Sequence, residues 1–201
     1  VNYRIKRVHP SMEEHLSPAF YLTTPVDDLE NNVIYINGKY VDNGQNELYP
    51  TLAHEGYPGH LYQNVYTGSC ELPLIRNLFS YPGYSEGWAT YVEFEYSGLL
   101  AGMEEDIAKL TGGESAWALA MSAYIDMAVH YDGWTKEDVS EFLMGYGIGD
   151  AGTVDEIFDL IVQEPANYLS YFIGYLEILN LREAAQKELG DDFHVKEVHE
   201  F

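Results

Sequence analysis

The chain has 201 residues, of which 46% are hydrophobic and 14% aromatic, enough for one domain with a full hydrophobic core. Its 33 acidic and 10 basic residues give a formal net charge of −23. Phosphate backbones and anionic lipids repel so acidic a chain, so we expect no nucleic-acid partner and no binding to a membrane surface.

The N-terminal part predicts a small sheet. Residues 1–8 mix charged and β-branched side chains, which predicts a strand or an extended arm, and residues 19–24 predict a short strand. Residues 33–36 and 39–41 flank Asn37-Gly38, the strongest two-residue signal for a β-hairpin. We therefore expect a small antiparallel sheet near the N-terminus.

The rest of the chain predicts helices. The long ones span residues 47–66 with a break at Pro58, residues 85–102 and residues 114–131. Two shorter helices are predicted to start at capping-box patterns, and the last long helix is predicted to have Pro165 as its first residue and Gly190 at its end. The two capping-box patterns are Thr135–Asp138 and Thr153–Glu156.

The sequence contains no internal repeat and no convincing linker. We therefore predict one mostly helical α+β domain over residues 1–201, with the small sheet packed on a helical body.

The most informative stretch holds His54, Glu55 and His60 within seven residues, with Pro58 and Gly59 between the histidines. In the usual zinc-hydrolase helix, two histidines four residues apart hold the metal, and the glutamate after the first is the general base. Here the histidines are six residues apart. On a regular helix they would point about 120° away from each other and would not share a metal.

Pro58 offers a way to bring the two histidines together. Its ring clashes with the carbonyl of His54, and Gly59 permits almost any backbone conformation. A helix broken here would bring His60 to the place that the fourth residue normally takes. The alternative, which the spacing leaves open, is two unrelated histidines on either side of a kink.

The helix predicted at residues 85–102 supplies a third metal ligand. A catalytic zinc normally has three protein ligands, the third commonly a glutamate from a later helix. Glu86 lies in the first turn, and Glu93 follows seven residues later on the same face. We interpret Glu86 as a ligand and Glu93 as the carboxylate that orients a ligand imidazole. Glu95 alongside keeps open the alternative of a solvated acidic face.

Three further residues are candidates for catalysis or support. Asp126 and His130 form an i, i+4 pair, which either satisfies itself inside the protein or places His130 toward a cleft, where it would donate to an oxyanion or a substrate carboxylate. Tyr171 belongs to an aromatic stripe of the last helix, a pattern that usually marks core. Its phenol is our candidate for bonding the oxygen of the tetrahedral intermediate.

Several of these stretches together resemble the bacterial domain of unknown function 885 family. They are residues 54–60 (HEGYPGH), 84–89 (YSEGWA), 126–135 and 165–174, with Leu181-Arg182-Glu183 further on. The resemblance covers nearly the whole chain in the right order. Asn167 and Leu61 stand where the family tends to have glutamine and histidine, and neither change removes a proposed ligand.

That family is grouped with zincin-type metallopeptidases. The resemblance therefore implies zinc (Zn2+) at His54, His60 and Glu86, with Glu55 as the general base. Members are generally longer, so it also implies that this chain is the C-terminal catalytic portion and that the missing N-terminal part of the same protein packs on it.

The leading hypothesis is a zinc-dependent hydrolase, most directly a metallopeptidase that cleaves small peptides. A substrate that is another small molecule remains open. One rival is a non-haem iron enzyme, because two histidines and one carboxylate also describe the iron site of oxygenases. Another is a catalytically inactive metal- or peptide-binding module. Glu55 favours hydrolysis, since iron chemistry has no obvious need for it.

Cys70 is the single cysteine, which excludes an internal disulfide framework and a cysteine-based zinc site. No run of about 18 apolar residues predicts a membrane span, and no leader segment opens the chain. These observations leave a cytoplasmic and an exported bacterial protein equally open.

Overall fold

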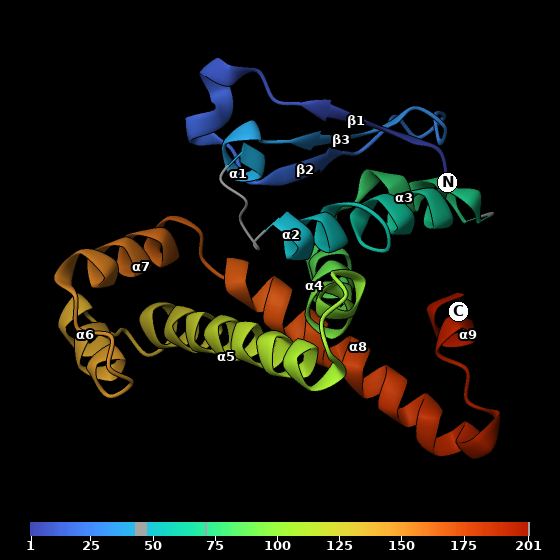
Figure 1. Ribbon diagram of the computed structural model, residues 1–201. Helices are drawn as coiled ribbons and strands as arrows, with labels where there is room; N and C mark the ends of the chain where they lie inside the picture. The colour runs from blue at the N-terminus through green and yellow to red at the C-terminus, as the bar shows by residue number, and fades with distance from the viewer. Residues whose placement is uncertain (43–47, 71, 201) are drawn as a thin grey trace.

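The computed structural model describes residues 1–42, 48–70 and 72–200. A small sheet lies over α2 and α3, and the long helices α4, α5 and α8 cross beneath them (Figure 1). The described helices are α1 (Gly38–Asp42), α2 (Leu48–Glu55), α3 (His60–Ser69), α4 (Pro82–Leu100), α5 (Glu105–His130), α6 (Lys136–Met144), α7 (Ala151–Gln163), α8 (Asn167–Leu189) and α9 (Val195–Glu200), with 3-10 helices η1 (Pro10–His15), η2 (Leu74–Leu78) and η3 (Gly190–Asp192).

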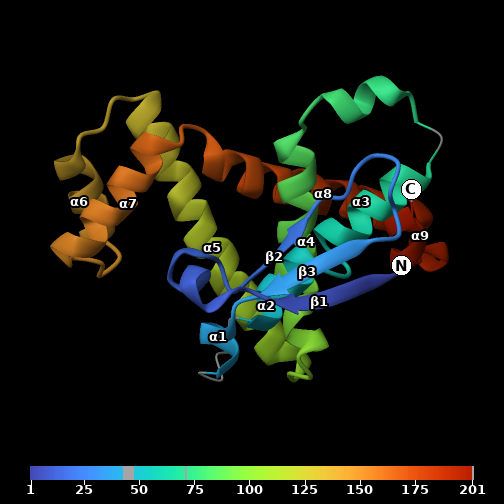
Figure 2. The same ribbon diagram turned by 90° about the horizontal axis from the view of Figure 1, so that it is seen from above.

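The predicted α+β class, mostly helical with an N-terminal sheet, is confirmed, but the sheet is mixed and not antiparallel throughout. Its strands β1 (Tyr3–Arg7), β2 (Ala19–Leu22) and β3 (Asn32–Ile36) lie in the order β1-β3-β2. β2 pairs antiparallel with β3, and β1 pairs parallel with the other edge of β3. One edge of β2 therefore stays unpaired in the described sheet (Figure 2), and it faces α2.

The hairpin predicted at Asn37-Gly38 is wrong, because β3 is followed by helix α1. A two-residue hairpin turn needs positive φ angles, and neither residue has one. The Asn37 amide is fully buried and donates to the carbonyls of Glu13 and Leu16, at 2.7 and 2.9 Å. Its oxygen accepts from the backbone N–H of Lys39 at 3.1 Å. Asn37 therefore caps a helix and anchors η1.

The helix ends confirm some predictions and correct others. Thr135 and Asp138 form the predicted capping box of α6. Asp150, not Thr153, caps α7, since its carboxylate accepts from the backbone N–H of Thr153 at 2.9 Å. Pro165 is not the first residue of α8, because Ala166 intervenes with a φ of 66°. The α7 cap comes from a side chain outside the predicted pattern, whereas α8 begins after a left-handed residue and has no side-chain cap.

Helices α4 and α5 begin earlier than predicted, α8 begins two residues later, and α8 is capped at its end by Gly190 as predicted. α4 starts at Pro82, and α5 starts at Glu105 and continues through Gly112-Gly113. The helix predicted from residue 47 is indeed interrupted at Pro58, becoming α2 and α3; Glu47 lies outside the described residues.

Three buried clusters hold the described elements together. Under the sheet, Tyr21 and Ile34 pack on Leu61 of α3. Between α4 and α8 lie Tyr91, Val92 and Tyr175. The third cluster joins α5, α6 and α7 and consists of Ile125, Val139, Leu143, Val154 and Ile161.

The short helix α9 packs back onto α4. The His199 ring lies edge-on to the Trp88 ring, with 5.1 Å between centroids. Its Nε2 lies 3.0 Å from the Tyr91 hydroxyl. Burial lowers the pKa of His199, and the nearby Arg182 charge lowers it further, so the ring is neutral at pH 7.

None of the helices in the described ranges combines the length and apolar composition that crossing a membrane requires.

Replacing Gly174 by alanine tests the contact between α4 and α8. A Cβ at Gly174 would lie 2.1 Å from the carbonyl oxygen of Gly83 and 2.8 Å from Cα of Gly87. Overpacking of this kind costs about 1–3 kcal/mol, so we expect Tm to fall by roughly 2–10 °C. Thermal denaturation followed by circular dichroism measures this.

Gly113→Ala is the matched control, because a Cβ there meets open space on the exposed side of α5. Alanine favours a helix interior by up to about 1 kcal/mol over glycine, so Tm should stay level or rise. Equal Tm values for the two variants would show that the helices do not depend on this close approach.

Candidate metal centre

The predicted break between the histidines is present. Helix α2 ends at Glu55, where the N–H of Gly56 still donates to the carbonyl of Leu52 at 2.9 Å, and α3 starts at His60. The indole N–H of Trp88 donates to the carbonyl of Pro58 at 3.0 Å and holds the connecting loop. A Cβ on Gly59 would lie 1.7 Å from the carbonyl oxygen of His54, so only glycine lets α3 begin this close to α2.

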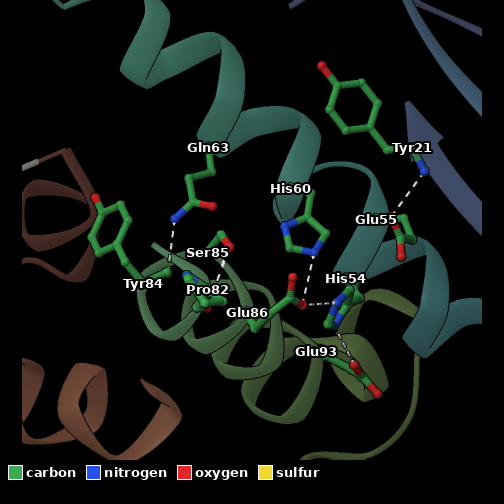
Figure 3. Close-up of polar contacts among 10 residues, drawn as sticks. All are labelled: Tyr21, His54, Glu55, His60, Gln63, Pro82, Tyr84, Ser85, Glu86 and Glu93. Carbon is green, nitrogen blue, oxygen red and sulfur yellow. Dashed lines mark hydrogen bonds and ion pairs between the residues drawn. The ribbon is translucent and has the colours of Figure 1, made fainter. Parts of the chain in front are cut away.

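This loop brings the two imidazoles together. The ring centroids of His54 and His60 lie 4.7 Å apart, with an interplanar angle of 85°. Glu86, from the first turns of α4, places one carboxylate oxygen between them (Figure 3). Its Oε2 lies 3.5 Å from Nε2 of His54 and 3.3 Å from Nε2 of His60. All three side chains are mostly buried.

These separations fit the donor set of one small cation. Zinc ligands at about 2.0–2.1 Å in tetrahedral geometry lie roughly 3.3–3.4 Å from each other. The measured separations between Glu86 and the two histidines, 3.3 and 3.5 Å, are close to this value. The residues present therefore fit a metal ion bound through two imidazole nitrogens and one carboxylate oxygen.

Glu55 competes with Glu86 for the place of third ligand. His54, Glu55 and His60 each offer a ligand atom within 4.8 Å of the other two. The separations from Glu86 are shorter, however, and Oε2 of Glu55 is held at 3.0 Å by the backbone N–H of Tyr21. Glu86 therefore fits the position of a third donor better than Glu55, which lies beside the centre.

Glu93 orients the first histidine, as its position seven residues after Glu86 predicts. Its Oε2 lies 2.9 Å from Nδ1 of His54, on the opposite side of the ring from Glu86 (Figure 3). A carboxylate accepts but does not donate, so Nδ1 carries the proton. When Nε2 is unprotonated, its lone pair points toward Glu86, which is the arrangement that metal-binding histidines use.

The carboxylates of Glu86 and Glu93 on either side of His54 favour a positive charge at this point. Burial alone lowers the pKa of His54, but hydrogen bonds to Glu86 and Glu93 outweigh it and raise this pKa to about 9. Burial raises the pKa of Glu86, but the contacts with His54 and His60 lower it to about 2. Both shifts largely describe the same contact. Without a metal ion, a proton on the imidazole supplies the positive charge.

Tyr171 from α8 joins the centre. Its ring stacks on the His54 ring, with 6.2 Å between centroids and an interplanar angle of 20°. Burial raises the pKa of Tyr171, and the Glu86 carboxylate beside it raises that pKa further. The phenol therefore keeps its proton and can donate a hydrogen bond. Gly174, one turn further along α8, permits the close approach to α4 that brings Tyr171 here.

Asp126 and His130 form a pair, but the structure does not bring them to this centre. Asp126 Oδ1 lies 2.8 Å from Nδ1 of His130 and accepts from the backbone N–H of Ala166 at 3.0 Å. Neither side chain is among the described residues that line the cavity next to His54 and His60. Asp126 instead fixes the start of α8, five residues before Tyr171. The catalytic role predicted for His130 therefore has no contact with the metal centre to support it among the described residues.

The centre opens into a cavity of about 790 Å³. Its walls come from β2 and the loop after it, from α3, and from the segment around η2. The described lining residues include Tyr21, Thr23, Asn64, Arg76, Tyr84 and Tyr171 together with His54, Glu55, His60 and Glu86. Sequence reasoning missed two features here. The first is Trp88, which holds the loop at Pro58 and whose only sequence signal is its position two residues after Glu86. The second is η2, which forms a wall of the cavity and has no sequence signal.

The fold and the centre define an α+β protein with a mostly buried site of two histidines and one carboxylate. Over residues 1–201 the sequence matches the family described as "Bacterial protein of unknown function (DUF885)", and the chain belongs to that family. No curated protein matches the sequence.

Two crystal structures from other bacteria resemble this one. A "putative lipoprotein" from Colwellia psychrerythraea is 29% identical, with a TM-score of 0.75 over 98% of this chain and 34% of its own. A protein from Shewanella oneidensis, described in the same words with the addition "of unknown function", is 24% identical, with a TM-score of 0.71 over 100% of this chain and 37% of its own. The second likeness shows the fold alone. The chain spans about a third of the length of either protein.

The stability of the metal-free protein should depend on pH through His54 and Glu86. The raised pKa of His54 gives stability that is complete below about pH 6.5 and is lost as the pH rises to about 9. The lowered pKa of Glu86 gives stability that is present above pH 4.5 and is lost as the pH falls toward about 2. We expect Tm, measured with a chelator present, to fall between pH 6.5 and 9.

His54→Asn is the control for this pH effect, since asparagine does not titrate. A Tm of the unmodified protein that stays level from pH 6.5 to 9, or that falls equally in the variant, would contradict the assignment of the shift to His54.

Replacing Glu93 by glutamine tests its orienting role. The amide keeps the size of the side chain but lets Nδ1 of His54 lose its carboxylate partner, so zinc affinity should fall by about 10- to 100-fold. Competition with a coloured zinc chelator measures the affinity. Glu114→Gln, an exposed change on α5 with the same loss of charge, should leave the affinity unchanged. An equal loss in both variants would mean that only net charge matters.

Proposed function

We propose that the protein is a zinc-dependent hydrolase, most directly a metallopeptidase. The observation that carries this proposal is Oε2 of Glu86 at 3.5 and 3.3 Å from Nε2 of His54 and His60. Those three groups would hold the metal. When bound, zinc would polarise the scissile carbonyl and lower the pKa of its water toward about 7.

Glu55 is the general base of this proposal. It follows His54 directly and lines the cavity, and Tyr21 fixes one of its oxygens with a hydrogen bond of 3.0 Å. That bond leaves the other oxygen free to face the reacting atoms. Glu55 would take a proton from the attacking water and pass it to the leaving amine.

Tyr171 is the donor to the developing oxyanion. It lies against both His54 and Glu86, and its raised pKa keeps the phenol protonated. A hydrogen bond aimed at the oxygen of the tetrahedral intermediate stabilises the charge that forms there. His130 was the second candidate for this role, and its contacts with Asp126 favour a structural role instead.

The unpaired edge of β2 supports a peptide as the substrate. The N–H of Tyr21 points to Glu55 and not to β3, so the backbone groups of Tyr21 face the cavity. Backbone direction alternates along a strand, so the N–H and C=O of Thr23 face the same edge. An extended peptide would bond the carbonyl of Tyr21 and the backbone groups of Thr23 as an additional strand, because the N–H of Tyr21 already donates to Glu55.

Two other functions use the same centre. A non-haem iron enzyme needs the two histidines and Glu86 but has no use for the adjacent Glu55. An inactive module would bind peptide along β2 without cleaving it. Elemental analysis of protein purified without added metal distinguishes zinc from iron, and the Glu55 experiment below separates an enzyme from a binding module.

We also propose that this chain works as part of a longer, exported protein. Both similar structures are described as lipoproteins, and this chain spans about a third of each. On η2 and just after it, Leu74, Leu78 and Phe79 expose 77%, 78% and 59% of their surface, an apolar patch that a further part of the chain would cover.

The decisive test is Glu55→Gln in the zinc-loaded protein. The variant should bind zinc as before and lose peptide hydrolysis by about 10²-fold or more, because it lacks a proton acceptor. Zinc content by elemental analysis and digestion of a peptide library measure the two properties. Glu114→Gln serves as the control for the loss of one acidic charge. Full turnover by the zinc-loaded Glu55→Gln protein would remove the general base from the proposal.

A further inference from the structure

The cavity beside the metal centre has one lysine or arginine among its described lining residues. This is Arg76, on η2. The segment that carries η2 arches from the end of α3 to the start of α4 (Figure 2). Arg76 is exposed to solvent on this cavity wall, so a ligand can reach its guanidinium group.

Arg76 has no ion-pair partner among the described residues. Its guanidinium carbon lies 5.9 Å from the centre of the Tyr81 ring, a cation–π contact that leaves its N–H donors free. Five of the other nine lysines and arginines have carboxylate partners among the described residues. They are Arg7, Lys109, Lys136, Arg182 and Lys196. A guanidinium with free donors lies ready to bind a planar anion through two hydrogen bonds.

The charges in the cavity define where an anionic group can bind. Glu55 and Glu86 at the metal centre, together with a net charge of −23, repel a carboxylate from most of the surface. Arg76 is the place on the cavity wall where this repulsion is offset. The volume of about 790 Å³ lies within the range that small ligands occupy, which favours a short peptide over a protein segment.

We propose that Arg76 binds a carboxylate of the substrate, so that the preferred substrates are short peptides with an acidic group near the scissile bond. The inference rests on the proposed peptidase function and names its substrate class. A free C-terminus and an aspartate or glutamate side chain present the same group, and Arg76 would bind either one.

The test uses peptides that differ only in this group. One pair has a free or amidated C-terminus, and a second pair has an amidated C-terminus with an internal aspartate or asparagine. With zinc-loaded protein we expect kcat/KM to be about tenfold or more higher for the acid member of at least one pair, mostly through KM. The pair that responds identifies the source of the carboxylate.

Variants at Arg76 decide the assignment. In Arg76→Gln the acid-to-amide ratio should fall to about one, and in Arg76→Glu it should fall below one through repulsion. Lys187→Gln, which removes an exposed charge on α8 away from the cavity, should keep the ratio of the unmodified protein. An unchanged ratio in Arg76→Gln overturns the proposal.

A binding measurement separates failure of this proposal from failure of the peptidase function. Fluorescence anisotropy with labelled versions of the same peptides and the zinc-loaded Glu55→Gln protein gives Kd without turnover. If no peptide is hydrolysed but the acid members bind about tenfold more tightly and lose this in Arg76→Gln, the carboxylate site stands and the peptidase function fails. Equal affinity within both pairs, or no binding, overturns the carboxylate site.

Discussion

The whole site depends on the contact between Gly59 and the end of α2. The loop after Glu55 turns back so tightly that any Cβ on Gly59 would overlap the carbonyl oxygen of His54. This contact lets α3 start where the next turn of α2 would lie, and His60 is the first residue of the new helix. Two histidines six residues apart thereby gain the geometry that an unbroken helix gives to a pair four residues apart.

Helix α4 provides most of the support around these histidines. Glu86, Trp88 and Glu93 lie within about two turns of α4. Glu86 and Glu93 contact the two sides of the His54 ring, and Trp88 contacts the loop between α2 and α3. Glu86 approaches both imidazoles, Trp88 holds the loop at Pro58, and Glu93 fixes the tautomer of His54. One rigid helix therefore sets the position of the centre as a unit, and α8 adds Tyr171 from the side.

Features that depend on contacts between residues close in sequence could be predicted, whereas features that depend on contacts between distant residues could not. The break at Pro58 follows from short-range rules of helix geometry and is confirmed. The spacing of Glu86 and Glu93 on one helix face likewise agrees with their contacts to His54. The metal-ligand set stays a prediction. The hairpin at Asn37 was wrong because its buried amide bonds to carbonyls 21 and 24 residues away, which a turn pattern does not contain. The parallel pairing of β1 and the bond from Tyr21 to Glu55, 34 residues apart, likewise depend on tertiary packing. The i, i+4 spacing of Asp126 and His130 predicted their contact but left open whether His130 faces a cleft, because that depends on how α5 packs against the rest of the chain.

The docking of α9 links the far end of the described chain to the metal loop. His199 touches the same indole ring whose N–H holds the carbonyl of Pro58, and it bonds to Tyr91 in the core between α4 and α8. Trp88 links α9 to the loop ahead of His60, and the Tyr66 hydroxyl of α3 donates to the carbonyl of Glu200 in α9. An extension, tag or binding partner that separates α9 from α4 would therefore weaken the packing of Trp88, whose indole N–H bonds to the carbonyl of Pro58. The position of His60 is in this sense a property that α9 can affect.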